Sequence, residues 1–160
     1  MTTPTPPVLE HAFDLEIDLA APLDLGRSAA GAHWFIEIAG GRVTGPRLTG
    51  EVLPGGGDWA VDRGDGTWQL DARYAVRLDD GTPVEVRNHG FYVEGEHGPR
   101  YYLTTPSFRV GRGATPATTA DDGPHGWLTR AVFVGEAFEI DPLHIRIEVH
   151  VVLHAGAAPA

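Results

Sequence analysis

The sequence predicts an all-β domain, built as an antiparallel sandwich or a closed barrel. Three observations support this prediction. Apolar and polar residues alternate with a period of two along most of the chain, no window of a dozen residues shows helical periodicity, and turn signals recur at intervals of roughly 8–12 residues. The chain of 160 residues is long enough to bury a core and is most simply a single domain.

Each strand is predicted from an alternating segment that ends at a turn signal. In the first segment Phe13, Leu15 and Ile17 belong to an apolar row that alternates with acidic residues. Strands are expected at residues 9–19, 32–39, 42–53, 67–78, 83–88, 91–94, 100–105, 127–134 and 143–153. The turns between them, rich in glycine, proline and aspartate, are expected at residues 40–41, 54–57, 65–66, 79–81, 89–90 and 95–99.

The first and last strands are expected to pair and so to close the sheet into a barrel. One face of residues 143–153 is apolar, and the other carries His144 and Arg146. The first strand has an acidic face that includes Glu16 and Asp18. Opposite charges on neighbouring strands form favourable cross-strand pairs, and closure removes the exposed edges of an open sheet.

The barrel domain is expected over residues 8–154, between a disordered N-terminal tail at residues 1–7 and a C-terminal tail of small residues at 155–160. Within it, residues 111–126 form one long segment without a strand pattern, which we interpret as either a lid or an unstructured loop. No run of about 18 apolar residues occurs, and the N-terminus lacks the features of a signal peptide, so we expect a cytoplasmic protein. The sequence leaves open whether two barrels pair into a homodimer.

Net charge and missing residue types exclude several classes of function. The formal net charge is −10 and the 12 cations are scattered arginines, so nucleic acid and anionic membranes are poor partners. Neither cysteine nor lysine occurs, which excludes thiol nucleophiles, zinc–thiolate sites and Schiff-base chemistry. The two serines, Ser28 and Ser107, lie outside any Gly-x-Ser-x-Gly motif. The remaining carboxylates, histidines, tyrosines, arginines and tryptophans suit acid–base catalysis or simple binding.

No metal site and no cofactor are expected, although the chain has eight histidines. The pair His-x-His does not occur, and His150 and His154 lie four residues apart on a strand, roughly 13 Å at about 3.3 Å per residue. One ion cannot bridge that distance. His89 follows the strand expected at residues 83–88, where it is either an exposed turn residue or a base at the mouth of the barrel.

The glycine-rich segment 40–59 ends in Asp58 and Trp59, the first candidates for a site. Glycine has no Cβ atom, so it permits both tight turns and a close approach of other groups. In one interpretation the segment holds only turns, with Asp58 capping a turn and Trp59 in the core. In the other, the carboxylate and the indole face a cavity, and Asp58 is a general acid or base whose pKa is raised by burial.

Two pairs of neighbouring residues supply further candidates, because successive side chains of a strand point to opposite faces. Only one of Arg73 and Tyr74 can point into the barrel. An inward Arg73 could pair with Asp58 and stabilise developing negative charge, whereas an inward Tyr74 would be a wall with a hydroxyl group; a structural ion pair is the simpler interpretation of Arg73. One of Tyr101 and Tyr102 must likewise face inward, where it could donate a proton or stack on an aromatic ligand.

Short motifs in a fixed order run along nearly the whole chain, over roughly residues 8–153. They are Gly40-Gly41, Gly45-Pro46-Arg47-Leu48, Gly50, Val52, Pro54-Gly55-Gly56, Asp58-Trp59, Asp65-Gly66, Asp71-Ala72-Arg73-Tyr74, Asp80-Gly81 and Trp127-Leu128-x-Arg130. This ordered set resembles the DUF3237 (UPF0311) family. The resemblance implies a closed, calycin-like or lipocalin-like antiparallel β-barrel with an interior pocket. Some members are linked to natural-product pathways as cofactor-independent cyclising or rearranging enzymes.

Three positions depart from the pattern of that family. Leu103 stands where the family commonly has an arginine after an aromatic pair, and Arg109 where an acidic residue often follows a phenylalanine. Thr129 stands where the family has an asparagine. If these positions line the pocket, the ligand is less polar than the usual ligand of the family.

We therefore expect a barrel that binds a small, largely apolar and aromatic metabolite, and most simply a cofactor-free enzyme that catalyses a cyclisation or an isomerisation. Asp58 would move a proton, Arg73 would stabilise negative charge and Tyr102 would donate a proton or a hydrogen bond. The residues expected to hold the substrate are Trp59, Tyr74, His89, Tyr101, Leu103, Trp127 and Thr129. Two alternatives stay open: a non-catalytic carrier or sensor with the same pocket, and a structural or assembly protein with a filled barrel.

Overall fold

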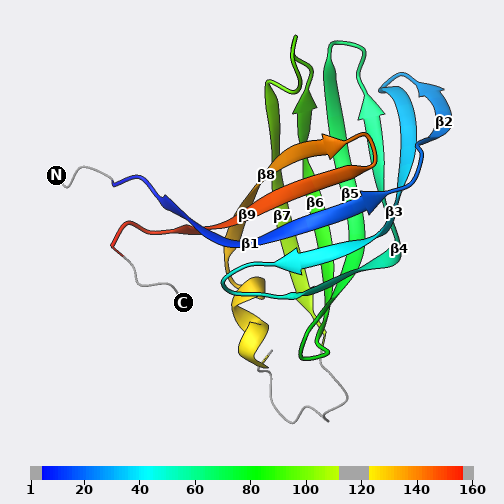
Figure 1. The fold of residues 1–160 in the computed structure, drawn as a ribbon. Helices are drawn as coiled ribbons and strands as arrows, with labels where there is room; N and C mark the ends of the chain where they lie inside the picture. Colours follow the sequence, from blue (N-terminus) through cyan, green and yellow to red (C-terminus); the bar gives the residue numbers. More distant parts are fainter. Residues whose placement is uncertain (1–4, 112–122, 157–160) are drawn as a thin grey trace.

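From the third strand onward, each strand of the sheet pairs antiparallel with the strand before it (Figure 1). The computed structural model describes residues 5–111 and 123–156. In these ranges it contains nine strands and one short 3₁₀ helix. They are β1 (Val8–Leu19), β2 (Leu23–Ser28), β3 (Gly31–Thr44), β4 (Gly50–Asp62), β5 (Thr67–Leu78), β6 (Pro83–Val93), β7 (Tyr101–Val110), η1 (Gly123–Thr129), β8 (Val132–Asp141) and β9 (His144–Leu153).

The first strand, β1, closes the sheet into a ring, because it pairs with β9 along one edge and with β3 along the other. Of the described strands only β2 lies outside the ring, paired with the first half of β3. The expected closed antiparallel barrel is therefore confirmed, and so is the pairing of the first and last strands. Glu16 lies opposite Arg146, and Asp18 opposite His144, as the charge pattern predicts.

The third strand pairs with β2 along its first half, with β1 along its second half and with β4 along its other edge, and it bends at Gly40 and Gly41. Its pairing with β4 shifts register between Ile38 and Gly41, and both glycines have a positive φ, of 150° and 145°. A Cβ atom on Gly41 would overlap the carbonyl oxygen of Glu16 in β1. Glycine is required here both by the backbone conformation and by the close approach of β1. The expected turn at these two glycines is wrong, because β3 continues through them.

Residues 54–57, also expected as a turn, lie inside β4. The pairing of β4 with β5 shifts register between Leu53 and Gly57, which marks a bulge. A bulge bends the strand and changes which side chains face inward beyond it. The glycines of this segment therefore bend the chain without reversing it.

A single strand, β6, replaces the two strands expected at residues 83–88 and 91–94. His89 and Gly90 pair with β5 and β7 and form no turn. A Cβ atom on Gly90 would overlap the carbonyl oxygen of Leu103 in β7. Gly90 therefore allows β6 and β7 to lie close together. A glycine in a sequence can indicate either a turn or such a close contact, and the sequence alone does not distinguish the two.

Two further elements differ from the expectation. The short strand β2 is not predicted from the sequence, because its apolar alternation is limited to Leu23 and Leu25, and all its residues are exposed. Residues 127–129, expected as the start of a strand, belong to η1, and β8 begins only at Val132. The expected tails and the long loop lie mostly outside the described residues.

One end of the barrel is filled by aromatic side chains and closed by η1, which lies beneath the strands in Figure 1. Phe108 packs edge to face against both Phe13 and Phe133, with ring centroids 5.7 and 5.0 Å apart. The helix is tied to the turn between β5 and β6 by the ring of His125, whose Nε2 lies 2.6 Å from the carboxylate of Asp80. This end of the barrel is a packed core, which leaves the other end for a site.

The close contact at Gly41 yields a test of the fold. We expect Gly41→Ala to lower the free energy of unfolding by roughly 2–5 kcal/mol, because it adds both backbone strain and an overlap with Glu16. Gly81 in the turn between β5 and β6 also has a positive φ, but a Cβ atom there would meet no atom within 4 Å. Gly81→Ala should therefore cost only about 1–2 kcal/mol. Urea unfolding of both variants measures the difference, and equal losses would contradict the proposed role of Gly41.

Candidate functional site

The site begins with Asp58, whose carboxyl group faces into the barrel from the middle of β4. Asp58 lies opposite Ile36 in β3 and opposite Ala72 in β5. Its Oδ1 accepts a hydrogen bond of 2.9 Å from the backbone N–H of Asp71. Burial raises the pKa of Asp58 to about 6, and the hydrogen bond from Asp71 only partly offsets this effect. A carboxyl group with this pKa can both give and take a proton near neutral pH.

An interior cavity of about 80 Å³ surrounds this carboxyl group. Its wall is formed by side chains from the ring strands, mostly isoleucine, leucine and alanine. The polar side chains that line it are Asp58, Tyr74, Asn88, Tyr102 and Thr104. A few polar groups in an apolar cavity are typical of a binding site for a small organic molecule.

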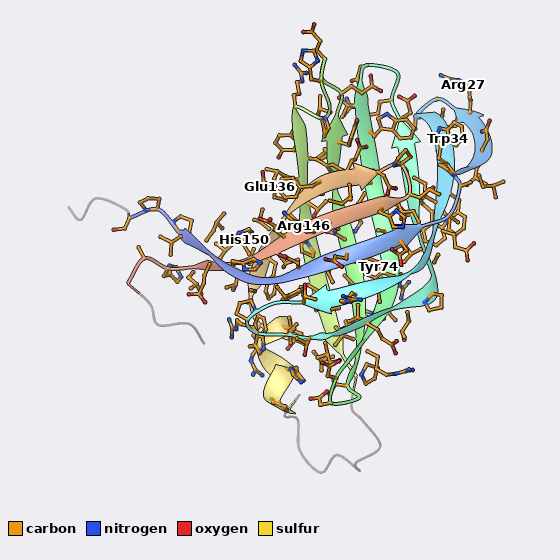
Figure 2. The ribbon with its side chains drawn as sticks, viewed as in Figure 1. Arg27, Trp34, Tyr74, Glu136, Arg146 and His150 are labelled. Atoms are coloured by element: carbon orange, nitrogen blue, oxygen red, sulfur yellow. The ribbon has the colours of Figure 1, made fainter. Side chains whose placement is uncertain are left out.

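Two of these polar groups have no hydrogen-bond partner in the described structure, the hydroxyl oxygen of Tyr74 and Oδ1 of Asn88. Tyr74 is 5% exposed and Asn88 is 3% exposed. In the view of Figure 2 the label of Tyr74 lies near the middle of the barrel, between β1 and β3. Most buried polar groups in proteins are hydrogen-bonded, so two such groups in one cavity indicate a place for a ligand or for water.

The tyrosines of the cavity are hydrogen-bond donors at neutral pH. Burial raises the pKa of both Tyr74 and Tyr102 well above the ordinary value, and the charge of Asp58 raises each of them further. Because the charge of Asp58 affects both hydroxyl groups, Asp58, Tyr74 and Tyr102 are close enough to interact electrostatically. A neutral phenol in an apolar cavity can donate a hydrogen bond to a ligand oxygen.

A second cavity of about 280 Å³ lies between the interior cavity and the mouth of the barrel. The two cavities adjoin, and we refer to them together as the passage; the residues that line both are Leu19, Ile36, Leu70, Tyr102 and Ile145. Aromatic rings and carboxylates surround the outer part, including Trp68, Tyr92, Glu94 and Glu139. Trp68 Nε1 donates a hydrogen bond of 3.3 Å to Glu94, and the rings of Tyr92 and Tyr102 meet edge to face at 5.1 Å.

Arg73 does not belong to this site, and the expectation that it stands beside Asp58 is wrong. In the pairing of β4 with β5, the residue opposite Asp58 is Ala72, so Arg73 points to the outer face and Tyr74 points inward. The Arg73 side chain is 60% exposed and forms an ion pair of 3.0 Å with Glu85. The simpler interpretation, a structural ion pair, describes this arginine.

Four other candidates also lie on the outside of the barrel. Trp59 is 51% exposed and packs on the ring of Phe35, with centroids 4.9 Å apart. His89 lies in the middle of β6, where its ring is 3.5 Å from Asp71 on the outer face, so it is neither a turn residue nor a base at the mouth. Tyr101 is 46% exposed, and Leu103 lines open grooves on the outer surface. Strand alternation turns each of them away from the cavity.

Trp127 and Thr129 lie in η1, at the closed end. The guanidinium carbon of Arg47 stands 3.7 Å from the centre of the Trp127 ring, and this ring also contacts Phe133. Thr129 Oγ1 donates a hydrogen bond of 2.8 Å to the carbonyl oxygen of Gly126. Neither residue lines the cavities described above. Leu103 and Thr129 therefore give no support to the expectation of a less polar ligand.

Asn88 and Thr104 are the site residues that the sequence analysis missed. Asn88 interrupts the inward row of β6 directly after Val84 and Val86, and Thr104 follows Tyr102 in the inward row of β7. A polar residue within a row of apolar inward residues indicates a residue of an interior site. For Asn88 this pattern is not recognisable in the sequence, because the next two residues, His89 and Gly90, resemble a turn that ends the strand.

The outer surface offers a larger groove of about 650 Å³ beside Pro54 and Trp59, but it is a weaker candidate. Its charged side chains are engaged with one another, because Glu85 pairs with Arg73 at 3.0 Å and with Arg109 at 3.8 Å. Among the described residues no group of three or more acidic, histidine or cysteine side chains could hold a metal ion. None of the described helices is long and apolar enough to cross a membrane.

Comparison with known proteins adds a family and a fold. The family model "Protein of unknown function (DUF3237)" matches residues 7–152. A UPF0311 protein of Rhodopseudomonas palustris is 30% identical over 162 residues, which cover 92% of this chain and 99% of that protein. The crystal structure of a conserved protein of unknown function from the same species superposes with a TM-score of 0.80 at 28% identity, over 94% of this chain and 100% of the other.

Two more solved structures share the fold, and one further protein is similar in sequence over part of the chain. A structure described as a beta-barrel like protein, from Acinetobacter baumannii, has a TM-score of 0.80 at 24% identity, over 95% of this chain and 99% of the other. A hydroalkoxylation enzyme of Penicillium herquei is 33% identical over 84 residues, which are 52% of this chain and 55% of that enzyme. The structure of an enzyme from this fungus has a TM-score of 0.70 at 20% identity, over 94% of this chain and 98% of the other.

The raised pKa of Asp58 predicts how stability depends on pH. The ordinary pKa is 3.8 and the folded pKa is about 6, so between these values the folded protein holds a proton that the unfolded chain releases. The free energy of unfolding therefore falls as the pH rises through this window, by about 2–3 kcal/mol from this group. Asp58→Asn should remove this contribution. Urea unfolding of both proteins between about pH 4 and pH 7 measures it, and parallel pH curves would contradict the buried state of Asp58.

Proposed function

The chain belongs to the DUF3237 family, and we propose that it is a cofactor-independent enzyme of natural-product metabolism. It binds a small, largely apolar or aromatic metabolite inside the barrel and cyclises or isomerises it by acid–base catalysis. One observation carries this proposal: a carboxyl group with a pKa of about 6 stands in an apolar cavity beside neutral tyrosines. A strongly shifted pKa in a cavity is typical of catalytic groups.

The reaction that suits this arrangement best is the addition of a substrate O–H group across a carbon–carbon double bond of the same molecule. The related enzyme of Penicillium herquei carries the name of this reaction, hydroalkoxylation. Protonated Asp58 gives its proton to one alkene carbon while the substrate oxygen bonds to the other. The oxygen then loses its proton to the Asp58 carboxylate, which restores the starting state. No atom is gained or lost, and no oxidant, reductant or metal enters the balance.

The passage contributes by positioning the substrate. Its isoleucine and leucine walls fix the conformation of an apolar chain or ring, which brings the reacting oxygen and the alkene together. Tyr102 lines both parts of the passage, so its hydroxyl group can donate a hydrogen bond to the substrate next to Asp58. The low polarity of the wall strengthens each of these electrostatic interactions. A cytoplasmic location and a homodimer stay predictions from the sequence.

Replacement of Asp58 is the first test of this proposal. Asp58→Asn should lower turnover by roughly 10²-fold or more, because the amide can neither give nor take the proton. Incubation of the purified protein with an extract of phenolic and polyketide metabolites, followed by mass spectrometry, identifies a substrate as a compound that is converted to a product of equal mass. Heat-denatured protein is the control for the extract. Glu51→Gln, on the outer face of the same strand, is the control for the substitution and should keep full turnover.

The outcome also separates an enzyme from a carrier with the same cavity. A compound that co-purifies with the protein unchanged, with no product from any extract, would show binding without catalysis and would reject the enzyme. Full turnover in Asp58→Asn would reject the assigned role of this carboxyl group.

Tyr102 gives a second, independent prediction. Tyr102→Phe should lower turnover about tenfold, because it removes one donor but leaves the proton-transfer group in place. The matched control is Tyr101→Phe, since Tyr101 is the neighbouring residue and faces outward. Initial rates at saturating substrate measure both effects. Equal rates for the two variants would contradict a role for the Tyr102 hydroxyl group.

A further inference from the structure

Part of the cavity lies over the side chain of Ala72, and we call this part the slot and the wall beneath it the floor. Asp58 lies opposite Ala72 in β4, and Asn88 lies opposite Ala72 in β6, so the three residues form one row across neighbouring strands. Strands lie roughly 4.8 Å apart, so about 10 Å separate the Cα atoms of Asp58 and Asn88. Only the methyl group of Ala72 stands between their side chains. Tyr74 is the next inward residue along β5, so its hydroxyl group shares this floor.

The two unpartnered atoms on the floor define what the slot can hold. Asn88 Oδ1 can only accept a hydrogen bond, and the Tyr74 hydroxyl group, whose pKa lies well above its ordinary value, has a proton to donate. Both side chains are more than nine-tenths buried, so bulk water does not satisfy them. A ligand group that both donates and accepts one hydrogen bond matches this pair. A hydroxyl group does so, whereas an ether or a ketone cannot donate and an ammonium group cannot accept.

The charges along the passage select against anions. The ionisable side chains that line the two cavities include the carboxyl groups of Asp58, Glu94 and Glu139. No arginine or histidine is among the lining residues in the described part of the chain. A substrate carboxylate or phosphate would meet only like charge on its way in, and it would lose its hydration without gaining a partner.

From these observations we infer that the slot over Ala72 binds a hydroxyl group of an uncharged alcohol or phenol. This hydroxyl group donates to Asn88 Oδ1 and accepts from the Tyr74 hydroxyl group. The inference rests on the proposed function, because it names the substrate class of the same site. Asn88 and Tyr74 are then the residues that set specificity, and they hold the substrate with its reactive part toward Asp58.

Equilibrium binding of three matched probes tests the inference without any reaction. Isothermal titration calorimetry compares 2-naphthol, its methyl ether and 2-naphthoate. For the unaltered protein we expect 2-naphthol to bind about tenfold more tightly than the ether, and 2-naphthoate to bind more weakly than either. In Asn88→Leu the preference for the hydroxyl group over the ether should fall to twofold or less.

A second variant and a stability measurement keep the test decisive. Tyr74→Phe removes a single oxygen atom and should reduce the preference to about threefold, while Tyr101→Phe on the outer face should leave it unchanged. Neither Asn88→Leu nor Tyr74→Phe should lower the melting temperature, because each removes a buried oxygen atom that has no hydrogen-bond partner. If Asn88→Leu fails to fold, Asn88 is structural and the inference is overturned for that residue; the comparison of Tyr74→Phe with Tyr101→Phe then decides for Tyr74.

Failure of the inference and failure of the proposed function give different results. Equal binding of 2-naphthol and its ether, an undiminished preference in both variants, or tighter binding of 2-naphthylmethylamine than of 2-naphthol would overturn the inference. A clear hydroxyl preference together with no turnover of any metabolite would support the inference and reject the enzyme. Turnover that depends on Asp58 but not on Asn88 or Tyr74 would support the enzyme and overturn the inference.

Discussion

The pairing of β1 with both β9 and β3 is the constraint on which the rest of the structure depends. It turns an open sheet into a ring, and only a ring gives each strand one face that is shielded from water on all sides. Asp58 illustrates the effect. Its neighbours in the sheet are ordinary residues, yet its pKa rises because closure removes water from the inner face of β4. The chemistry of the site is therefore a consequence of a contact made elsewhere in the barrel.

The same ring is dense at one end and hollow at the other, and side-chain size accounts for the difference. Phe13, Phe108 and Phe133 fill the end that η1 covers. Isoleucine and leucine form most of the wall of the interior cavity at the hollow end, no phenylalanine among the described residues lines either cavity there, and the small side chain of Ala72 leaves space beside Asp58. A large side chain in place of Ala72 would fill that space, so the cavity depends on side-chain size at a few inward positions.

The sequence was sufficient to predict the closed barrel but not to predict which side chains face its interior. Alternation and opposite charges predicted the closed barrel and the pairing of Glu16 with Arg146, since these depend on periods that the sequence displays directly. Trp59 directly follows the inward Asp58 on β4, and Arg73 directly precedes the inward Tyr74 on β5, so alternation turns both to the outer face. The sequence shows that such neighbours point to opposite faces, but which of the two points inward is set by the register of the strands in the sheet. Asp58 and Tyr102 were placed among the inward residues by resemblance and chemistry, and their environment became clear only from the packing around them.

The pairing of β1 with β9 also has a consequence for how the chain folds. The two partners are separated by almost the entire sequence, with β1 at Val8–Leu19 and β9 at His144–Leu153. Contacts of such long range slow folding, because a large loop must be closed before they form. During synthesis β1 can pair with β3 early, but its other edge has no partner until the last strand leaves the ribosome. Until then, that bare edge is open to strands of other nascent chains, so the barrel is most exposed to misassembly in the interval just before it closes.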